Sequence, residues 1–134
     1  MRLHYYLKTG KLIHLRRGLY AKDPQYSLYE LATKIYTPAY ISFETVLLKA
    51  GITFQHYDTI FVASYLSRSV DCDQHNFQFK KIKSVVLTNP MGILNQHEYA
   101  IATPERALLD ILYLNKDYYF DNLNPIDWDK LYQL

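Results

Sequence analysis

The stretch from residue 101 to residue 112 reads Ile-Ala-Thr-Pro-Glu-Arg-Ala-Leu-Leu-Asp-Ile-Leu, and it predicts a strand end that runs directly into a buried helix. Thr103 can cap this helix, because its hydroxyl can accept a hydrogen bond from a backbone N–H that has no partner in the first turn. Pro104 follows at the first helical position, where its missing N–H costs nothing. Glu105 brings negative charge to the positive end of the helix dipole. Apolar residues then recur at helical spacing, so we expect a mostly buried helix that packs through Ala107, Leu108, Ile111 and Leu112, widened by Leu109 and Leu114.

A second stretch is built in the same way. Residues 38–51 read Pro-Ala-Tyr-Ile-Ser-Phe-Glu-Thr-Val-Leu-Leu-Lys-Ala-Gly. Ser42 is the expected cap, Glu44 lies in the first turn, and Gly51 can end the helix in the left-handed conformation. We expect these two capped helices to form the core of the main domain.

The remaining elements follow from the spacing of apolar residues and from turn signals. A further helix is expected over residues 27–36, where Ser27 and Glu30 form a capping box. Pro125 is expected to open a last short helix that packs through Trp128, Leu131 and Tyr132. The expected strands are 59–66, 77–80 (with an alternative end at 82), 85–88 and 99–103, with a polar loop over residues 67–76. Helices and strands in this order predict an α+β fold, with capped helices packed on a β-sheet.

Length and composition narrow the class of protein. The 134 residues suffice for one domain, or for one small domain with part of a second, and 49% hydrophobic residues suffice for a core. The 14 tyrosines suit a half-exposed core edge or an interface, because each combines an apolar ring with a polar tip. A single cysteine, Cys72, excludes an intramolecular disulfide framework. No apolar run approaches the roughly 18 residues of a membrane span, and the N-terminus lacks a signal-peptide core. We therefore expect a cytoplasmic protein without a membrane partner.

The charge is distributed unevenly along the chain. Residues 1–22 carry six basic residues and no acidic residue, whereas the remainder carries nine basic and thirteen acidic residues. The first segment is therefore +6 and the rest is −4. This asymmetry predicts that the N-terminal segment binds a polyanion while the rest of the chain has another role.

The N-terminal segment has the pattern of a helix followed by a basic hairpin. A short helix is expected over residues 2–9, and strands over 12–15 and 19–21 are joined by a turn at residues 16–18. This order matches the second half of a winged helix-turn-helix, whose recognition helix enters the major groove of DNA. The candidate DNA contacts are Arg2, Tyr5, Lys8, Lys11, His14, Arg16, Arg17 and Lys22. A basic hairpin that is merely solvated remains the alternative.

Candidate catalytic residues are few. The five histidines have no metal-ligand spacing, no thiolate lies near Cys72, and no glycine-rich phosphate loop is present, so we expect neither a metal nor a cofactor. Glu44, Glu105 and Asp110 are the carboxylates that a small metal-dependent nuclease would use. We favour a structural role for them: the two glutamates serve helix N-termini, and Asp110 pairs with Arg106 at i,i+4. The sequence therefore favours a protein that is not an enzyme.

Three blocks of this sequence resemble the AbiEi-type antitoxins. Residues 10–20 (Gly-Lys-Leu-Ile-His-Leu-Arg-Arg-Gly-Leu-Tyr) look like the wing of that family, residues 38–47 look like the start of its second domain, and residues 101–110 look like a third shared block. The resemblance implies an antitoxin of a type IV toxin–antitoxin system, linked to phage defence by abortive infection. It also implies that the winged helix binds operator DNA and represses the operon. The second domain would counteract a nucleotidyltransferase-like toxin without a stable complex.

The chain departs from the family pattern at its N-terminus, because the first two helices of the winged helix are absent. We expect residues 1–23 to form a partial winged helix-turn-helix and residues 24–134 to form an antitoxin-like α+β domain. Weak DNA binding with little sequence preference follows from the missing helices. The alternative outside DNA binding is an interaction module, in which Trp128 and the aromatic residues 118–120 form a protein interface or a self-association surface.

Overall fold

A computed structural model describes residues 13–16, 19–21, 27–55, 58–72, 74–96 and 98–134 of the chain. Over these residues it confirms the α+β prediction, with five helices and a six-stranded mixed sheet on which helices pack. The helices are α2 (Leu28–Ile35), α3 (Phe43–Ala50), α4 (Ser84–Leu87), α5 (Pro104–Leu114) and α6 (Trp128–Tyr132). The strands of the sheet are β3 (Tyr40–Ile41), β4 (Thr59–Ser64), β5 (Arg68–Cys72), β6 (His75–Lys81), β7 (Ile93–Asn95) and β8 (Ala100–Ala102).

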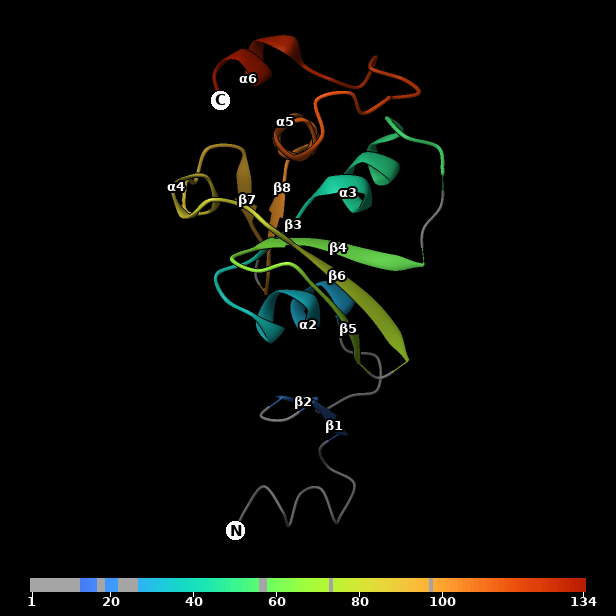
Figure 1. The fold of residues 1–134 in the computed structure, drawn as a ribbon, viewed down its shortest axis with the longest axis vertical. Coiled ribbons are helices and arrows are strands. Elements are labelled where there is room, and N and C mark those ends of the chain that lie inside the picture. Colours follow the sequence, from blue (N-terminus) through green and yellow to red (C-terminus); the bar gives the residue numbers. More distant parts are fainter. Residues whose placement is uncertain (1–12, 17–18, 22–26, 56–57, 73, 97) are drawn as a thin grey trace.

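The strand order in the six-stranded sheet is β5-β6-β4-β3-β8-β7. Parallel pairs join β4 to β6 and β3 to β8, and the other neighbours are antiparallel. In Figure 1, α3 and α5 lie on one side of the sheet, α2 lies on the other, and α6 lies beyond α5. Because helices cover both faces, the central strand β4 is buried over its last four residues, as a strand between two helical layers should be.

The core includes buried side chains of α2 as well as of α3 and α5, and the Phe79 ring of β6 packs edge-on against Tyr36 at the end of α2. The largest fully enclosed side chains of the core are Phe43, Phe77, Phe79, Ile41 and Leu47, which come from α3, β6 and the short strand β3. Phe43 adopts a positive φ of 58°, which is unusual for a bulky residue. Such a conformation persists only where the surroundings hold it, and here the ring has no solvent exposure.

Most predicted helix ends are confirmed. Ser27 Oγ accepts a hydrogen bond from the Glu30 N–H at 3.2 Å, and Thr103 Oγ1 accepts one from the Arg106 N–H at 3.3 Å. Gly51 ends α3 with a φ of 80°, and its N–H bonds back to the last turn of the helix. Local sequence therefore sets these helix ends, as capping chemistry predicts.

The predicted hairpin is also present. Strands β1 (Ile13–Arg16) and β2 (Leu19–Ala21) pair antiparallel, with His14 opposite Tyr20. The pairing register shifts between His14 and Arg16. The predicted helix over residues 2–9 lies outside the described residues.

Two predicted strand and loop assignments are wrong. Residues 85–88 are predicted as a strand, but Ser84–Leu87 form the short helix α4, whose Val86 carbonyl accepts a hydrogen bond from a distant arginine described below. Residues 67–76, predicted as a polar loop, contain β5 and the start of β6. The two strands pair antiparallel, with Arg68 opposite Phe79 and Cys72 opposite His75. The polar side chains of β5 are exposed at the sheet edge while Val70 and Cys72 are buried, so pairing with β6 forms this strand.

The last helix also differs from its prediction. It begins at Trp128 rather than at Pro125, because Asp127 caps it by accepting hydrogen bonds from the N–H groups of residues 129 and 130. Trp128 and Tyr132 were expected to pack inward, yet they are 46% and 80% exposed, and only Leu131 packs against the core. Among the described residues, no helix is long and apolar enough to cross a membrane.

Candidate functional site

The second and third sequence blocks meet at one edge of the sheet. Helix α3 follows β3 directly and α5 follows β8 directly, and β3 and β8 are parallel neighbours with Ile41 opposite Ile101. Because parallel strands end at the same sheet edge, the N-termini of α3 and α5 begin side by side (Figure 1). This topology brings Tyr40 and Ser42 to the first turns of α5.

Asp110, on the second turn of α5, is the centre of a buried polar network. Its Oδ2 accepts hydrogen bonds from Tyr40 Oη at 2.8 Å and from Ser42 Oγ at 2.7 Å. Its Oδ1 accepts a hydrogen bond from Arg106 Nε at 3.3 Å, which is also the predicted i,i+4 ion pair. The carboxylate therefore has a donor on each oxygen, as a buried charge requires.

Arg106 extends the network to the segment between α4 and β7. Its Nη2 donates to the Val86 carbonyl at 2.6 Å, and its Nη1 donates to the Asn89 carbonyl at 3.0 Å and to the Met91 carbonyl. Nη2 also donates to Tyr40 Oη at 3.2 Å, and the guanidinium lies over the Tyr40 ring. One planar guanidinium thus binds three carbonyls, at the end of a short helix and in the turn that follows it.

Burial governs the protonation of this network. Loss of water around Asp110 raises the pKa of its carboxyl, although the hydrogen bonds from Ser42 and Tyr40 and the charge of Arg106 act in the opposite direction. Burial, together with the nearby Asp110 charge, also raises the pKa of the Tyr40 hydroxyl. The side chains of all four residues are almost completely enclosed, so the network joins parts of the fold rather than facing a substrate.

The sequence predicted one pair of this network and missed the rest. The Arg106–Asp110 pair is confirmed. Ser42 does occupy the cap position of α3, but its hydroxyl makes no cap hydrogen bond and donates to Asp110 instead, so that detail was wrong. A signal was present: Arg106 and Asp110 share a helical face with Ala107 and Ile111, which places a charged pair on the apolar face.

The three carboxylates of the nuclease alternative have separate partners. Glu105 Oε2 accepts a hydrogen bond from the Asp127 N–H at 3.2 Å, and Asp110 is held in the network above. Glu44 Oε1 lies 3.6 Å from Lys80 Nζ, which is an ion-pair distance but too long for a hydrogen bond. In the part of the chain that the structure describes, no three His, Cys, Asp or Glu side chains form a group that could hold a metal ion.

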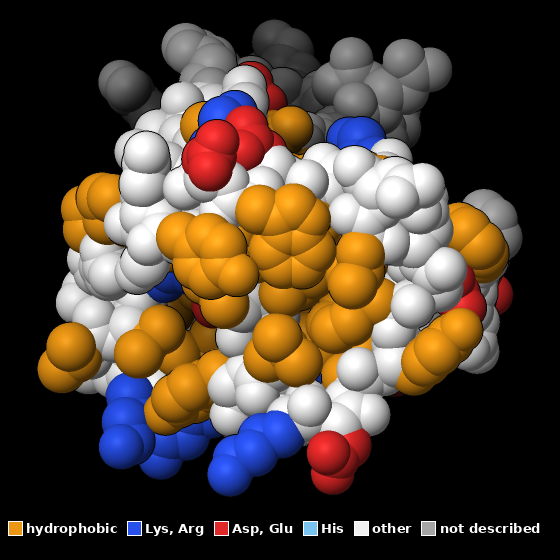
Figure 2. Space-filling view, turned by 90° about the horizontal axis from the view of Figure 1, so that it is seen from above, with side chains coloured by type: hydrophobic (Ala, Val, Ile, Leu, Met, Phe, Trp, Pro, Cys, Tyr) orange, Lys and Arg blue, Asp and Glu red, His pale blue; other side chains and the backbone are white. Residues whose placement is uncertain are grey.

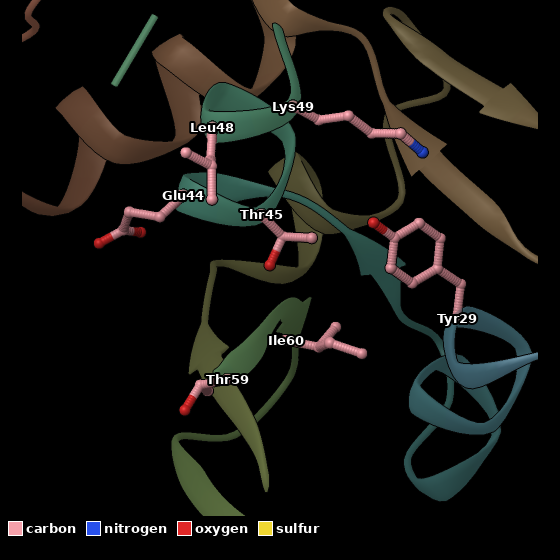
Figure 3. Close-up of a pocket in the computed structure, with 7 residues that line it drawn as sticks. All are labelled: Tyr29, Glu44, Thr45, Leu48, Lys49, Thr59 and Ile60. Carbon is pink, nitrogen blue, oxygen red and sulfur yellow. The ribbon is translucent and has the colours of Figure 1, made fainter. Parts of the chain in front are cut away.

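A pocket of about 360 Å³ lies between α2, α3 and β4. Figure 3 shows Tyr29 and Lys49 on one side of it and Glu44 on the other; the remaining lining residues are Thr45, Leu48, Thr59 and Ile60. Lys49 Nζ lies 5.2 Å from the centre of the Tyr29 ring. Thr45 Oγ1 accepts from the Phe61 N–H, and Thr59 Oγ1 donates to Asn76. Both threonine hydroxyls are therefore used within the fold and do not mark a ligand site.

The predicted DNA contacts fall mostly outside the described residues. Of the eight candidates, only the backbone of His14 and Arg16 is described, and both residues lie on β1. Arg2, Tyr5, Lys8, Lys11, Arg17 and Lys22 lie outside the described part of the chain. The structure therefore supplies the hairpin backbone on which the basic wing was predicted, and the contacts themselves stay a prediction.

Comparisons of this chain with known protein families, with curated proteins and with solved structures found no match.

Proposed function

We propose that this chain is a non-catalytic antitoxin and transcriptional autorepressor of a type IV toxin–antitoxin system, acting in the cytoplasm. Residues 1–23 would supply the DNA-binding part, and residues 24–134 would supply the antitoxin domain. The functional counterpart would be a nucleotidyltransferase-like toxin with which no stable complex forms.

The observation that carries the proposal is the meeting of the resembling blocks in space. Tyr40 and Ser42 from the block 38–47 share one buried network with Arg106 and Asp110 from the block 101–110. The polar residues of both blocks therefore bind one another in the folded domain, which supports treating the two blocks as parts of one structural unit. The antiparallel pairing of β1 with β2 supports the wing assignment of the block 10–20.

The DNA-binding half of the proposal depends on charge. Six positive charges on residues 1–22 can neutralise phosphates without reading bases. Contacts to phosphates alone give non-specific binding, with an expected Kd on the order of 10⁻⁴ to 10⁻⁶ M at physiological salt. The proposed antitoxin activity requires no catalytic residues in this chain.

The antitoxin assignment predicts a gene for a nucleotidyltransferase-like toxin beside the gene for this chain, and co-expression with that toxin tests the antitoxin half. Wild-type protein should restore growth, and no complex should co-purify. The variant Arg16→Ala/Arg17→Ala should restore growth equally well, because it changes only the proposed wing. Failure of the well-expressed, folded wild type to restore growth would contradict the antitoxin assignment.

A further inference from the structure

One end of the molecule carries an unusual concentration of exposed apolar side chains. Residues 113–134, which we call the C-terminal face, comprise the end of α5, the segment after it and α6. Among the described residues, eleven large hydrophobic side chains are exposed, and six of them belong to this face: Tyr113, Leu114, Tyr119, Leu123, Trp128 and Tyr132. Figure 2 looks onto this end of the molecule and shows apolar side chains gathered at its centre.

The exposed side chains of this face are of the kind that forms protein interfaces. Tyr119 and Tyr132 are 79% and 80% exposed. The Trp128 and Tyr132 rings lie 6.5 Å apart on α6, a helix that has no buried residue of its own. Tyrosine and tryptophan are enriched among the residues that contribute most to binding, because each removes a large ring from water at a low entropic cost. Contiguous exposure of such residues marks an interaction surface.

The charge of the face indicates what covers it. The face contains four aspartates (117, 121, 127 and 129) and two lysines (116 and 130), so its net charge is −2. Two copies of the face brought together would repel each other. The complementary charge exists in the same sequence, because residues 1–22 are +6 and contain Arg2, Arg16 and Arg17. Arginine binds both to carboxylates and to the faces of tyrosine and tryptophan rings.

We propose that the C-terminal face binds the basic segment 1–22 of a second copy of this chain. The two surfaces are different, so the contact is heterologous, and a bound pair still offers one free face on one chain and one free segment on the other. Association should therefore continue beyond dimers as concentration rises. This inference uses the charges and the exposed rings alone and does not depend on the antitoxin assignment.

Sedimentation velocity of the full chain over a range of concentrations tests the proposal. The weight-average mass should start near 15.9 kDa and rise with concentration at about 0.1 M salt. It should fall back at about 1 M salt, where the Debye length shortens from about 10 Å to about 3 Å. A protein that stays monomeric at every concentration would overturn the proposal. Association that grows stronger with salt would also overturn it, because apolar contact alone would then be responsible.

Two variants separate the two surfaces. Tyr119→Ser/Tyr132→Ser removes the exposed rings of the face, and Arg16→Glu/Arg17→Glu reverses two charges of the segment. Each variant alone should be monomeric. An equimolar mixture should form a complex of roughly two chains and no larger, because one variant still has its face and the other still has its segment.

The matched control is Val85→Ser, on α4. Its side chain is 82% exposed, as much as the two tyrosines, and it lies outside the C-terminal face. This variant should associate like the wild type. Loss of association in Val85→Ser, or a mixture of the two double variants that stays monomeric although both remain folded by circular dichroism, would overturn the assignment of the surfaces.

Discussion

Ser42 Oγ donates a hydrogen bond of 2.7 Å to Asp110 Oδ2, across 68 residues of sequence. The serine was expected to cap its own helix, and it instead satisfies a buried carboxylate on a neighbouring helix. This contact joins the two capped helices around which the domain is built. The stability of the domain should therefore respond strongly to changes in the network.

We expect Ser42→Ala to destabilise the fold by about 1.5–3 kcal/mol, the range for a hydrogen bond to a charged group. The substitution removes one donor from the Asp110 carboxylate and adds no steric clash. Urea denaturation measures the effect. Ser84→Ala, at an exposed position on α4, is the control and should change stability by no more than about 0.5 kcal/mol. Equal effects from the two substitutions would contradict the role of Ser42.

Arg106→Met should be the more severe change, at about 3–5 kcal/mol, because it leaves a buried carboxylate without its cationic partner. Asp110→Leu should cost a similar amount, because the guanidinium is then buried alone. The double variant should cost less than the sum by about 0.5–3 kcal/mol, since no unpaired charge remains. A double-mutant cycle from denaturation curves checks this. Strict additivity would show that the pair is not coupled.

The pH dependence of stability should carry the signature of Asp110. Its pKa in the folded protein is raised above the ordinary 3.8, so the folded state binds the proton more tightly than the unfolded state does. This contribution is fully present below pH 3.8 and is lost as pH rises through the raised pKa. The stability of the wild type relative to Asp110→Asn should therefore fall as pH increases from about 4 toward neutrality. A difference that stays constant or rises over that interval would contradict the effect of burial.

Two glycines offer a matched pair of substitutions. Gly51 and Gly92 both have a positive φ, at 80° and 76°. A Cβ at Gly51 would meet no atom within 4 Å, whereas one at Gly92 would lie 2.9 Å from Arg106 Cβ and 3.0 Å from a methyl carbon of Leu134. Gly51→Ala should thus cost only the conformational term, about 1–2 kcal/mol. Gly92→Ala should cost more, because the backbone must also move away from the network. Thermal and urea unfolding of both variants provide the comparison, and a smaller loss for Gly92→Ala would contradict the close packing.

DNA binding by the basic segment should depend on salt and not on sequence. A titration of a short duplex at about 50 mM and about 200 mM salt should give a clear drop in affinity. Arg16→Ala/Arg17→Ala should reduce the salt slope by about 1.8, since each neutralised phosphate contributes about 0.9. Lys81→Ala/Lys83→Ala, two exposed positions beyond the segment, serves as the control and should leave the slope unchanged. Undetectable binding at low salt, or an unchanged slope in the arginine variant, would exclude the wing as a DNA contact.

The sequence by itself determined the parts of the fold that depend on neighbours along the chain. The capping roles of Ser27 and Thr103 and the left-handed end at Gly51 follow from chemistry within one turn of helix. The i,i+4 pair of Arg106 and Asp110 is local in the same sense. The charge asymmetry between residues 1–22 and the rest is a property of composition and needs no structure.

Only the tertiary structure decided the features whose partners come from far along the chain. Residues 84–87 are a helix and not a strand, in a segment whose Val86 carbonyl binds Arg106, twenty residues away. Residues 68–72 form a strand because β6 supplies the hydrogen-bonding partner, although most of their side chains are polar. Helix α6 packs against the core through Leu131, and this leaves Trp128 and Tyr132 exposed. An amphipathic pattern of five residues is too short to specify which residue packs inward. The buried network arose in the same way, because the parallel pairing of β3 with β8 placed two distant helix starts side by side.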